Sequence, residues 1–128
     1  MAEWSSNELE TIDATDELEI SSMREGDALS GSRTIWVVHA GDDLYIRSVY
    51  GRDGEWHRGT QSRHEGHIRC GGVEKDVSFV DVDADDEVQD RIDDAYRAKY
   101  PGYPKKYVDD CLTPQARAAT LRLVPRSA

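Results

Sequence analysis

The segment Thr34–Tyr50, TIWVVHAGDDLYIRSVY, carries the strongest secondary-structure signal in the chain. Two runs rich in β-branched and aromatic residues, Thr34–His39 and Leu44–Tyr50, flank the turn-forming residues Ala40–Asp43. Runs of this kind on either side of a short polar turn are typical of a β-hairpin. The segment therefore predicts two antiparallel strands.

The second of these strands has two different faces. Successive side chains of a strand point to opposite sides, so Leu44, Ile46 and Ser48 share one face, whereas Tyr45 and Arg47 share the other. Arg47 and Ser48 consequently emerge on opposite faces where the strand ends.

A second hairpin is predicted over His67–Val82, with its turn at Gly71-Gly72. A helix of about Ala84 to Tyr100 follows, because Asp83 can cap it and Pro101 ends it. Its apolar side chains recur at helical spacing, which predicts a face that packs on the sheet: Val88, Ile92, Ala95 and Tyr96.

The remaining segments complete an outline of about six strands. Ser5 and Glu8 form a capping-box pattern for a first short helix. Strand patterns are found near Leu18–Ser22 and Thr120–Pro125, and Thr113-Pro114 begins another short helix. The glycine-rich stretch between the two hairpins is predicted to be loop and turn. The order of elements indicates a mainly β protein, a small barrel with flanking helices.

Composition limits the function. A chain of 128 residues is the size of one domain, which we expect to span residues 1–128. Its net charge of -10 and pI of about 4.7 argue against binding to nucleic acid or to an anionic membrane. Without a membrane-length apolar run or a signal-peptide pattern, we expect a cytoplasmic protein with free thiols at Cys70 and Cys111.

Two sequence stretches carry a family resemblance. GRDGEWHRG, from Gly51, followed by HIRCGGVEKDVSF, from His67, is similar to a segment of deazaflavin-dependent nitroreductases, with Trp56-His57 at their Trp-Tyr position. Over roughly Glu17 to Pro125 the chain resembles an uncharacterised bacterial domain family grouped with the FMN-binding split barrels. The resemblance implies a split β-barrel.

The same resemblance implies a cofactor site and a homodimer. Flavin-binding relatives hold the cofactor phosphate with basic and hydroxyl side chains at the end of the strand matching Leu44–Tyr50 and in the loop after it. Arg47, Ser48, Arg52 and Arg58 match these in type and place, which implies binding of FMN or a deazaflavin coenzyme. Split barrels commonly build this site between two subunits.

Aromatic side chains could wall the adjoining substrate pocket. Trp36, Tyr45 and Trp56 could stack on a planar ring, although burial in the core is the alternative, above all for Trp36. His57 is the candidate catalytic acid or base, since its side chain titrates near neutral pH. Cys70 as a nucleophile is less favoured than Cys70 in a buried strand.

A metal site is not expected. His64, His67 and Cys70 form a His-x-x-His-x-x-Cys pattern, but residues three apart in a strand point to opposite faces and a fourth ligand is missing. We therefore assign no metal ligands.

Three functions remain open from the sequence. The first is a flavin- or deazaflavin-dependent oxidoreductase acting on a small organic substrate. The second is a cofactor-free split barrel that binds or transforms a small molecule in the equivalent pocket. The third is a structural or interaction protein whose arginine-rich loop, Tyr50–Gly72, is simply solvated.

Overall fold

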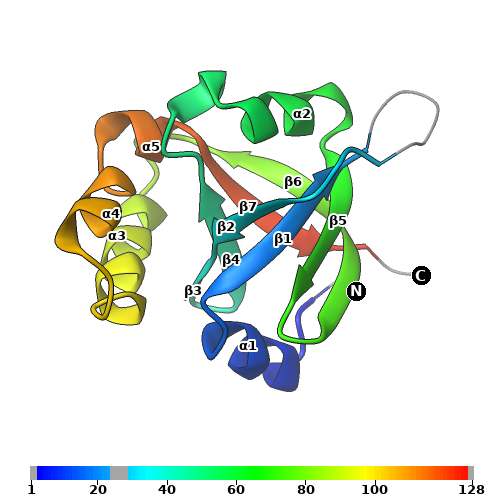
Figure 1. Cartoon of the computed structure of the whole chain (residues 1–128), viewed down its shortest axis with the longest axis horizontal. Helices are drawn as coiled ribbons and strands as arrows, with labels where there is room; N and C mark the ends of the chain where they lie inside the picture. Colours follow the sequence, from blue (N-terminus) through cyan, green and yellow to red (C-terminus); the bar gives the residue numbers. More distant parts are fainter. Residues whose placement is uncertain (1–2, 24–28, 127–128) are drawn as a thin grey trace.

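The computed structural model describes residues 3–23 and 29–126 and contains one antiparallel sheet (Figure 1). The sheet order is β2-β1-β5-β6-β7-β4-β3. Its strands are β1 (Glu17–Ser22), β2 (Arg33–Trp36), β3 (Val38–Ala40), β4 (Asp43–Arg47), β5 (Glu65–Cys70), β6 (Val73–Val82) and β7 (Thr120–Pro125).

The two edge strands of the sheet, β2 and β3, are consecutive in the chain and are separated only by Val37. This short connection holds the two edges together, and the sheet curls into a nearly closed barrel. The predicted hairpin exists as β3 and β4, with Val38 opposite Tyr45. Its first run, however, is broken at Val37, and β2 pairs with β1 instead. The expectation of one continuous first strand was therefore wrong. The backbone of Val37 is held by two other side chains: its N–H donates to the Tyr100 hydroxyl at 3.1 Å, and its carbonyl accepts from Lys99 Nζ at 2.8 Å.

The barrel separates two apolar clusters. Leu44 and Ile46 face the barrel interior, in the cluster that also holds Phe79, whereas Tyr45 faces outward into a second cluster with Ile92. The predicted alternation along β4 is thus confirmed for these core residues. Each face of this strand is buried by a different part of the protein.

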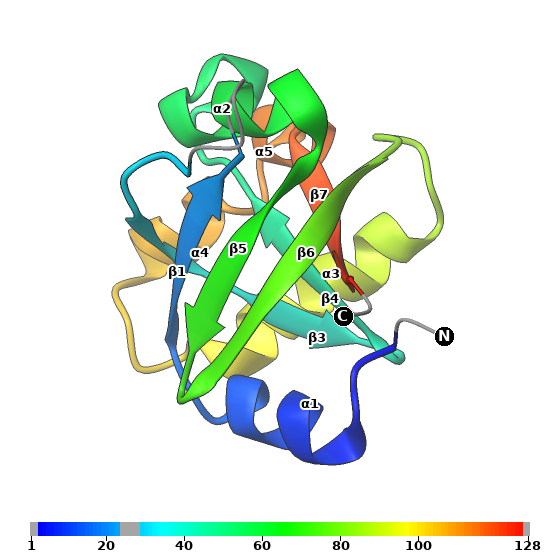
Figure 2. The same ribbon diagram turned by 90° about the vertical axis from the view of Figure 1, so that its right-hand side faces the viewer.

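Helices cover the barrel at its two ends and along one side (Figures 1 and 2). The helix α1 (Ser6–Asp13) has the predicted capping box of Ser5 and Glu8. The helices α3 (Val88–Lys99), α4 (Lys105–Asp110) and α5 (Pro114–Ala118) pack along one side, and Thr113 caps α5 as predicted. The long helix begins later than expected, at Val88 and not Ala84. Asp86, and not Asp83, accepts from its first N–H at 2.9 Å.

The second hairpin is confirmed as β5 and β6, and its glycines have identifiable roles. Gly71 and Gly72 form the turn with φ of 59° and 92°, values that favour glycine. Gly66 lies in β5 where a Cβ atom would stand 2.1 Å from the Ser21 carbonyl and 2.7 Å from the Phe79 ring. Only glycine allows β1 and β5 to approach this closely over the core.

The prediction of loop and turn between the hairpins was wrong. The segment contains a short 3-10 helix, η2 (Gly51–Asp53), and the helix α2 (Glu55–Arg63), which lies across one end of the barrel (Figures 1 and 2). Gly59 brings α2 close to β1, because a Cβ there would lie 3.3 Å from Ser22 Oγ. His64 ends the helix in the left-handed conformation. The burial of His57 and Thr60 thus stabilises α2 enough to outweigh the low helix propensity of Gly59.

Candidate functional site

A groove of about 780 Å³ lies between α2 and the edge formed by β1 and β2. Ile20 forms an apolar part of the groove's floor. Among the described residues, the hydroxyl side chains that line its walls are Ser22, Ser30, Ser32 and Ser62. Gly31 and Gly59 also line the groove, and because they have no side chain they do not fill it. A hydroxyl-rich groove of this size suits an organic ligand with a polar end.

Among the described residues, three charged side chains line this groove: Arg33, Glu55 and Arg58. Arg33 Nη2 lies 3.1 Å from Glu55 Oε2. Arg58 projects from α2, and its guanidinium has neither a hydrogen bond nor an ion pair with another residue in 3–23 or 29–126. The ionic lining is therefore +1, whereas the whole chain is -10. The groove is a cationic site on an acidic protein, and it favours an anionic ligand.

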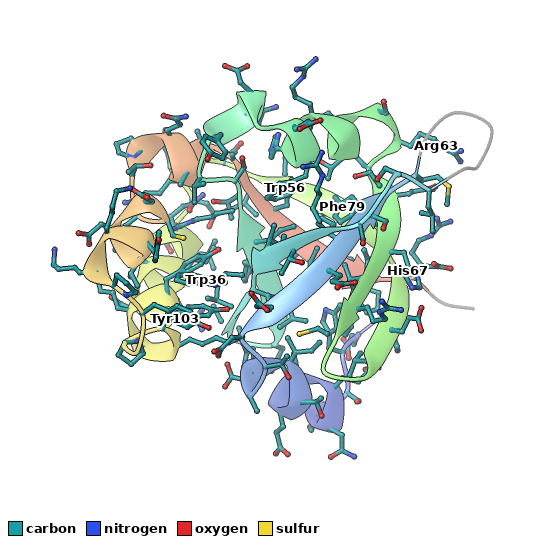
Figure 3. All side chains as sticks on the ribbon, in the orientation of Figure 1. Trp36, Trp56, Arg63, His67, Phe79 and Tyr103 are labelled. Atoms are coloured by element: carbon teal, nitrogen blue, oxygen red, sulfur yellow. The ribbon has the colours of Figure 1, made fainter. Side chains whose placement is uncertain are left out.

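Trp56 is the aromatic wall of the groove (Figure 3). Its indole is half-buried, and it packs against the barrel core while still lining the groove. An indole held on one side and open on the other can stack on a planar ring. Trp56, which was predicted to wall the substrate pocket, is one of the residues that line the groove.

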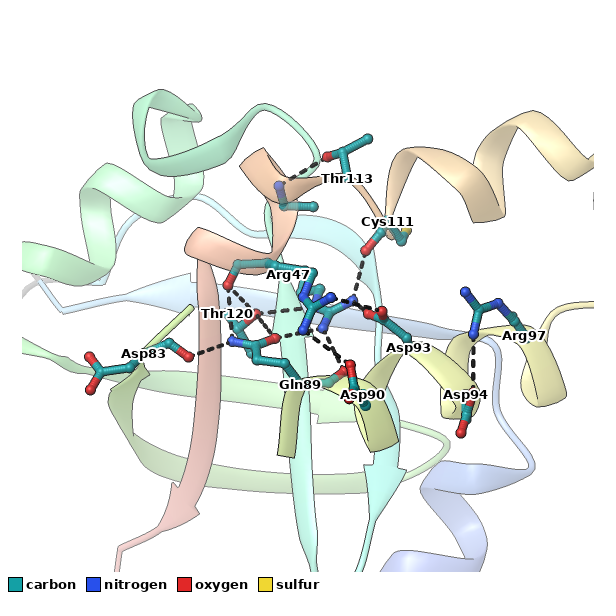
Figure 4. Close-up of polar contacts among 12 residues, drawn as sticks. Arg47, Asp83, Gln89, Asp90, Asp93, Asp94, Arg97, Cys111, Thr113 and Thr120 are labelled. Atoms are coloured by element: carbon teal, nitrogen blue, oxygen red, sulfur yellow. Dashed lines mark hydrogen bonds and ion pairs between the residues drawn. The ribbon is translucent and has the colours of Figure 1, made fainter. Parts of the chain in front are cut away.

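Arg47 lies outside the groove, in the layer between the barrel and α3 (Figure 4). Its guanidinium makes five hydrogen bonds: to Thr120 Oγ1, to Asp93 Oδ1 and the Cys111 carbonyl, and to both the carbonyl and Oε1 of Gln89. A guanidinium has five N–H donors, so none remains for a ligand phosphate. We assign Arg47 to the framework of the fold.

Ser48 and His57 are completely buried beneath η2 and α2. Neither Ser48 Oγ nor the ring nitrogens of His57 have a hydrogen-bond partner in the described part of the chain. Burial lowers the pKa of His57, so its ring is neutral at pH 7. The candidate acid or base is therefore enclosed by α2, and it does not line the groove.

The other predicted site residues are dispersed. Arg52 is exposed and makes two long hydrogen bonds, to the Ala118 carbonyl at 3.5 Å and to Gln61 Oε1 at 3.4 Å. Trp36 stacks on Tyr100 with the ring centroids 3.9 Å apart, and Tyr45 is buried in the cluster beside α3. Of the residues predicted for cofactor and substrate, Trp56 and Arg58 line the groove.

The histidines and cysteine of the metal-like pattern point to different surroundings. His64 lies 3.5 Å from Asp81, His67 lies between Asp76 and Glu74, and Cys70 is buried. Within residues 3–23 and 29–126, no three such side chains gather as metal ligands. Burial also raises the pKa of the Cys70 thiol, which disfavours the nucleophilic thiolate.

We expect His67 to make stability depend on pH. Burial lowers the pKa of His67, but hydrogen bonds to Asp76 and Glu74 outweigh this, and the net pKa lies above its ordinary value. The stabilisation is complete below pH ~6.5 and disappears as pH rises through the raised pKa. His67→Gln should therefore cost about 0.5 to 1 kcal/mol at pH 6 and less at pH 9, measured by urea denaturation.

The double variant Glu74→Gln/Asp76→Asn provides the control, because it removes both negative charges beside His67. In that background His67→Gln should have the same effect at the two pH values. An equal cost of His67→Gln at pH 6 and pH 9 in the otherwise native protein would contradict the assignment.

Several residues that line the groove were not predicted from the sequence. Ser30 and Ser32 precede β2 and Arg33 begins it, in the stretch Ser-Gly-Ser-Arg, and only folding brings them opposite α2. A hydroxyl- and glycine-rich stretch ending in arginine is a signal that could have drawn attention to them. Ser62 lies in the arginine-rich segment Tyr50–Gly72, but its position in a helix was not predicted.

Known structures with the same architecture define the class of protein. A protein from Listeria innocua, named provisionally as a pyridoxamine 5'-phosphate oxidase, is 16% identical with a TM-score of 0.63, over 93% of this chain and 90% of that one. An FAD-binding protein from Mesorhizobium loti is 12% identical with a TM-score of 0.63, over 97% and 91%. An F420 reductase is 12% identical with a TM-score of 0.54, over 93% and 92%. At these identities the similarity establishes the fold, a split barrel.

The particular family follows from the sequence. Residues 8–123 match the family DUF2255, described as an uncharacterized protein conserved in bacteria, and the chain belongs to it. Among curated proteins, the comparison finds no match. In the described residues, no helix has the length and apolar character needed to cross a membrane.

Proposed function

We propose that this split barrel is an oxidoreductase that binds FMN or a deazaflavin coenzyme in the groove beside α2 and acts on a small organic substrate. A homodimer is part of this proposal. The observation that carries it is the combination, in one groove, of several hydroxyl groups, a half-buried indole and an arginine whose guanidinium has no partner among the described residues.

The donor set of the groove fits a phosphate group. Guanidinium groups offer several N–H donors in a planar fork, and hydroxyl groups add further donors around an anion. Arg58 and Arg33 supply the first kind, and Ser30, Ser32 and Ser62 supply the second. These residues would hold the anionic end of the cofactor.

The remaining side chains would orient the cofactor and exclude water. Trp56 would stack on a planar ring, and Ile20 would cover part of it from the barrel side. When bound, a flavin-type ring supplies the hydride chemistry, and the protein contributes binding and orientation. No residue lining the groove is assigned to proton transfer, because His57 is enclosed.

One observation favours a second function, a cofactor-free barrel that binds or transforms a small molecule in the same groove. The residues that the family resemblance assigned to the phosphate do not converge: Arg47 has no free donor, Ser48 is enclosed, and Arg52 is exposed elsewhere. The groove would then receive a different anionic ligand through Arg58.

Reversal of the charge at position 58 tests the proposal. Arg58→Glu should weaken FMN binding by about ten- to a hundredfold, because it removes a charge-assisted hydrogen bond worth ~1.5 to 3 kcal/mol. The affinity would be measured by flavin fluorescence and by calorimetry, with a deazaflavin titrated in parallel.

Arg97→Glu is the matched control, since Arg97 is an exposed arginine of α3 and does not line the groove. It should leave the affinity for FMN unchanged. If the wild-type protein binds neither FMN nor a deazaflavin at millimolar concentration while remaining folded, the cofactor-free function replaces the first.

A further inference from the structure

Glu55 forms an ion pair with Arg33, one of the two arginines that line the groove among the described residues. Its carboxylate contacts Arg33 at 3.1 Å, and the two side chains come from opposite walls, the first turn of α2 and strand β2. The side chains are 79% and 55% exposed, respectively. Water therefore competes for this ion pair, and exposed pairs of this kind are easily broken.

We infer that Glu55 is an internal competitor of the ligand phosphate, whose carboxylate holds Arg33 until a phosphate monoester displaces it. This inference rests on the proposed function of the groove as an anion site. A phosphate monoester carries close to two negative charges at pH 7 and three acceptor oxygens, so it can engage Arg33 and Arg58 together. A carboxylate, with one charge, is the weaker partner for Arg33.

The charges of the groove explain why displacement is favourable. With the Arg33–Glu55 pair intact, Arg58 is the one described groove residue that offers an unpaired positive charge. Rotation of Glu55 toward water leaves two guanidinium groups facing the ligand. The Glu55 carboxylate has no second partner within 3–23 and 29–126, so no other side-chain contact must break.

Removal of the competing charge provides the test. Glu55→Gln should tighten FMN binding by about two- to fivefold at low ionic strength, the range expected for the loss of one exposed ion pair. Riboflavin, which has no phosphate, should bind Glu55→Gln and wild type equally. Both ligands would be titrated by fluorescence at pH 7.5, after circular dichroism has shown that the variants are folded.

Two further variants separate this contact from a general charge effect. Asp53→Asn removes a neighbouring exposed carboxylate that has no ion pair in the described residues, and it should change FMN affinity by less than about 1.5-fold. In an Arg33→Gln background, Glu55→Gln should have no effect. An equal gain from Asp53→Asn, or a gain that persists without Arg33, would overturn the inference.

Failure of this inference can be distinguished from failure of the proposed function. If wild type binds neither FMN nor a deazaflavin, the proposed function fails, and inorganic phosphate becomes the probe. Phosphate should then raise the melting temperature of Glu55→Gln more than that of wild type. Equal stabilisation of the two proteins by phosphate would refute the role of Glu55 directly.

Discussion

Replacement of Arg47 by Met is expected to lower the free energy of unfolding by about 3 to 5 kcal/mol, because it leaves a buried carboxylate without its main partner. The Arg47 side chain is fully buried, and Nη1 lies 2.6 Å from Asp93 Oδ1 (Figure 4). Four further acceptors lose their hydrogen bonds, among them Gln89 Oε1. Guanidinium chloride denaturation measures the loss.

The pair Arg97–Asp94 gives the control, because it lies exposed on α3, the helix that also carries Asp93. Its Nη1 and Oδ1 atoms are 3.0 Å apart. Arg97→Met should cost at most about 1 kcal/mol. The double variant Arg47→Met/Asp93→Leu should recover much of the loss, since an apolar pair can replace a buried ion pair. A cost of Arg47→Met no larger than that of Arg97→Met would show that the network does not stabilise the fold, and Arg47 would again be available for a ligand.

Replacement of Ile92 by Ala should cost about 2 to 5 kcal/mol, the range for deleting a large aliphatic side chain from a packed core. Ile92 is completely buried in the cluster with Val38, Tyr45 and Tyr96, where α3 packs on the outer face of the barrel. The predicted stripe along this helix is confirmed for Ile92 and Tyr96. Urea denaturation followed by circular dichroism measures the change.

Asp94→Ala is the matched control on the same helix, because the Asp94 side chain is 79% exposed. It should change stability by no more than about 0.5 kcal/mol. A loss below that value for Ile92→Ala as well would mean that α3 contributes little to the stability of the barrel.

Local patterns predicted most of the elements. Alternation assigned Leu44 and Ile46 to the barrel core, Gly71-Gly72 marked a hairpin turn, and helical spacing placed Ile92 against the sheet. Each of these features depends on neighbours close in sequence or on a repeat of fixed period. Such signals can be read without knowing which distant residues will come together.

The helix α2 could not be predicted in this way. Gly54 and Gly59 and the many polar residues around them indicated loop, because their local helix propensity is low. Contacts from distant elements decide otherwise: Gly59 approaches Ser22 of β1, and His57 becomes fully buried over the barrel end. The groove exists because of this helix, so the position of Ser62 in it was also beyond the sequence.

The sequence by itself determined a small, acidic, mainly β domain with two hairpins, a packed helix and a cationic segment. Only the tertiary structure decided how the barrel closes and which arginines line the groove. The strand signal runs unbroken through Val37, yet Lys99 and Tyr100 take its backbone hydrogen bonds and direct β2 and β3 to opposite edges of the sheet. Arg47 and Arg58 look alike in sequence, but the partners of Arg47 are contributed by α3 and β7 and the segment before α5. Burial and hydrogen bonding between residues 40 to 75 positions apart set these outcomes, and no local pattern encodes them.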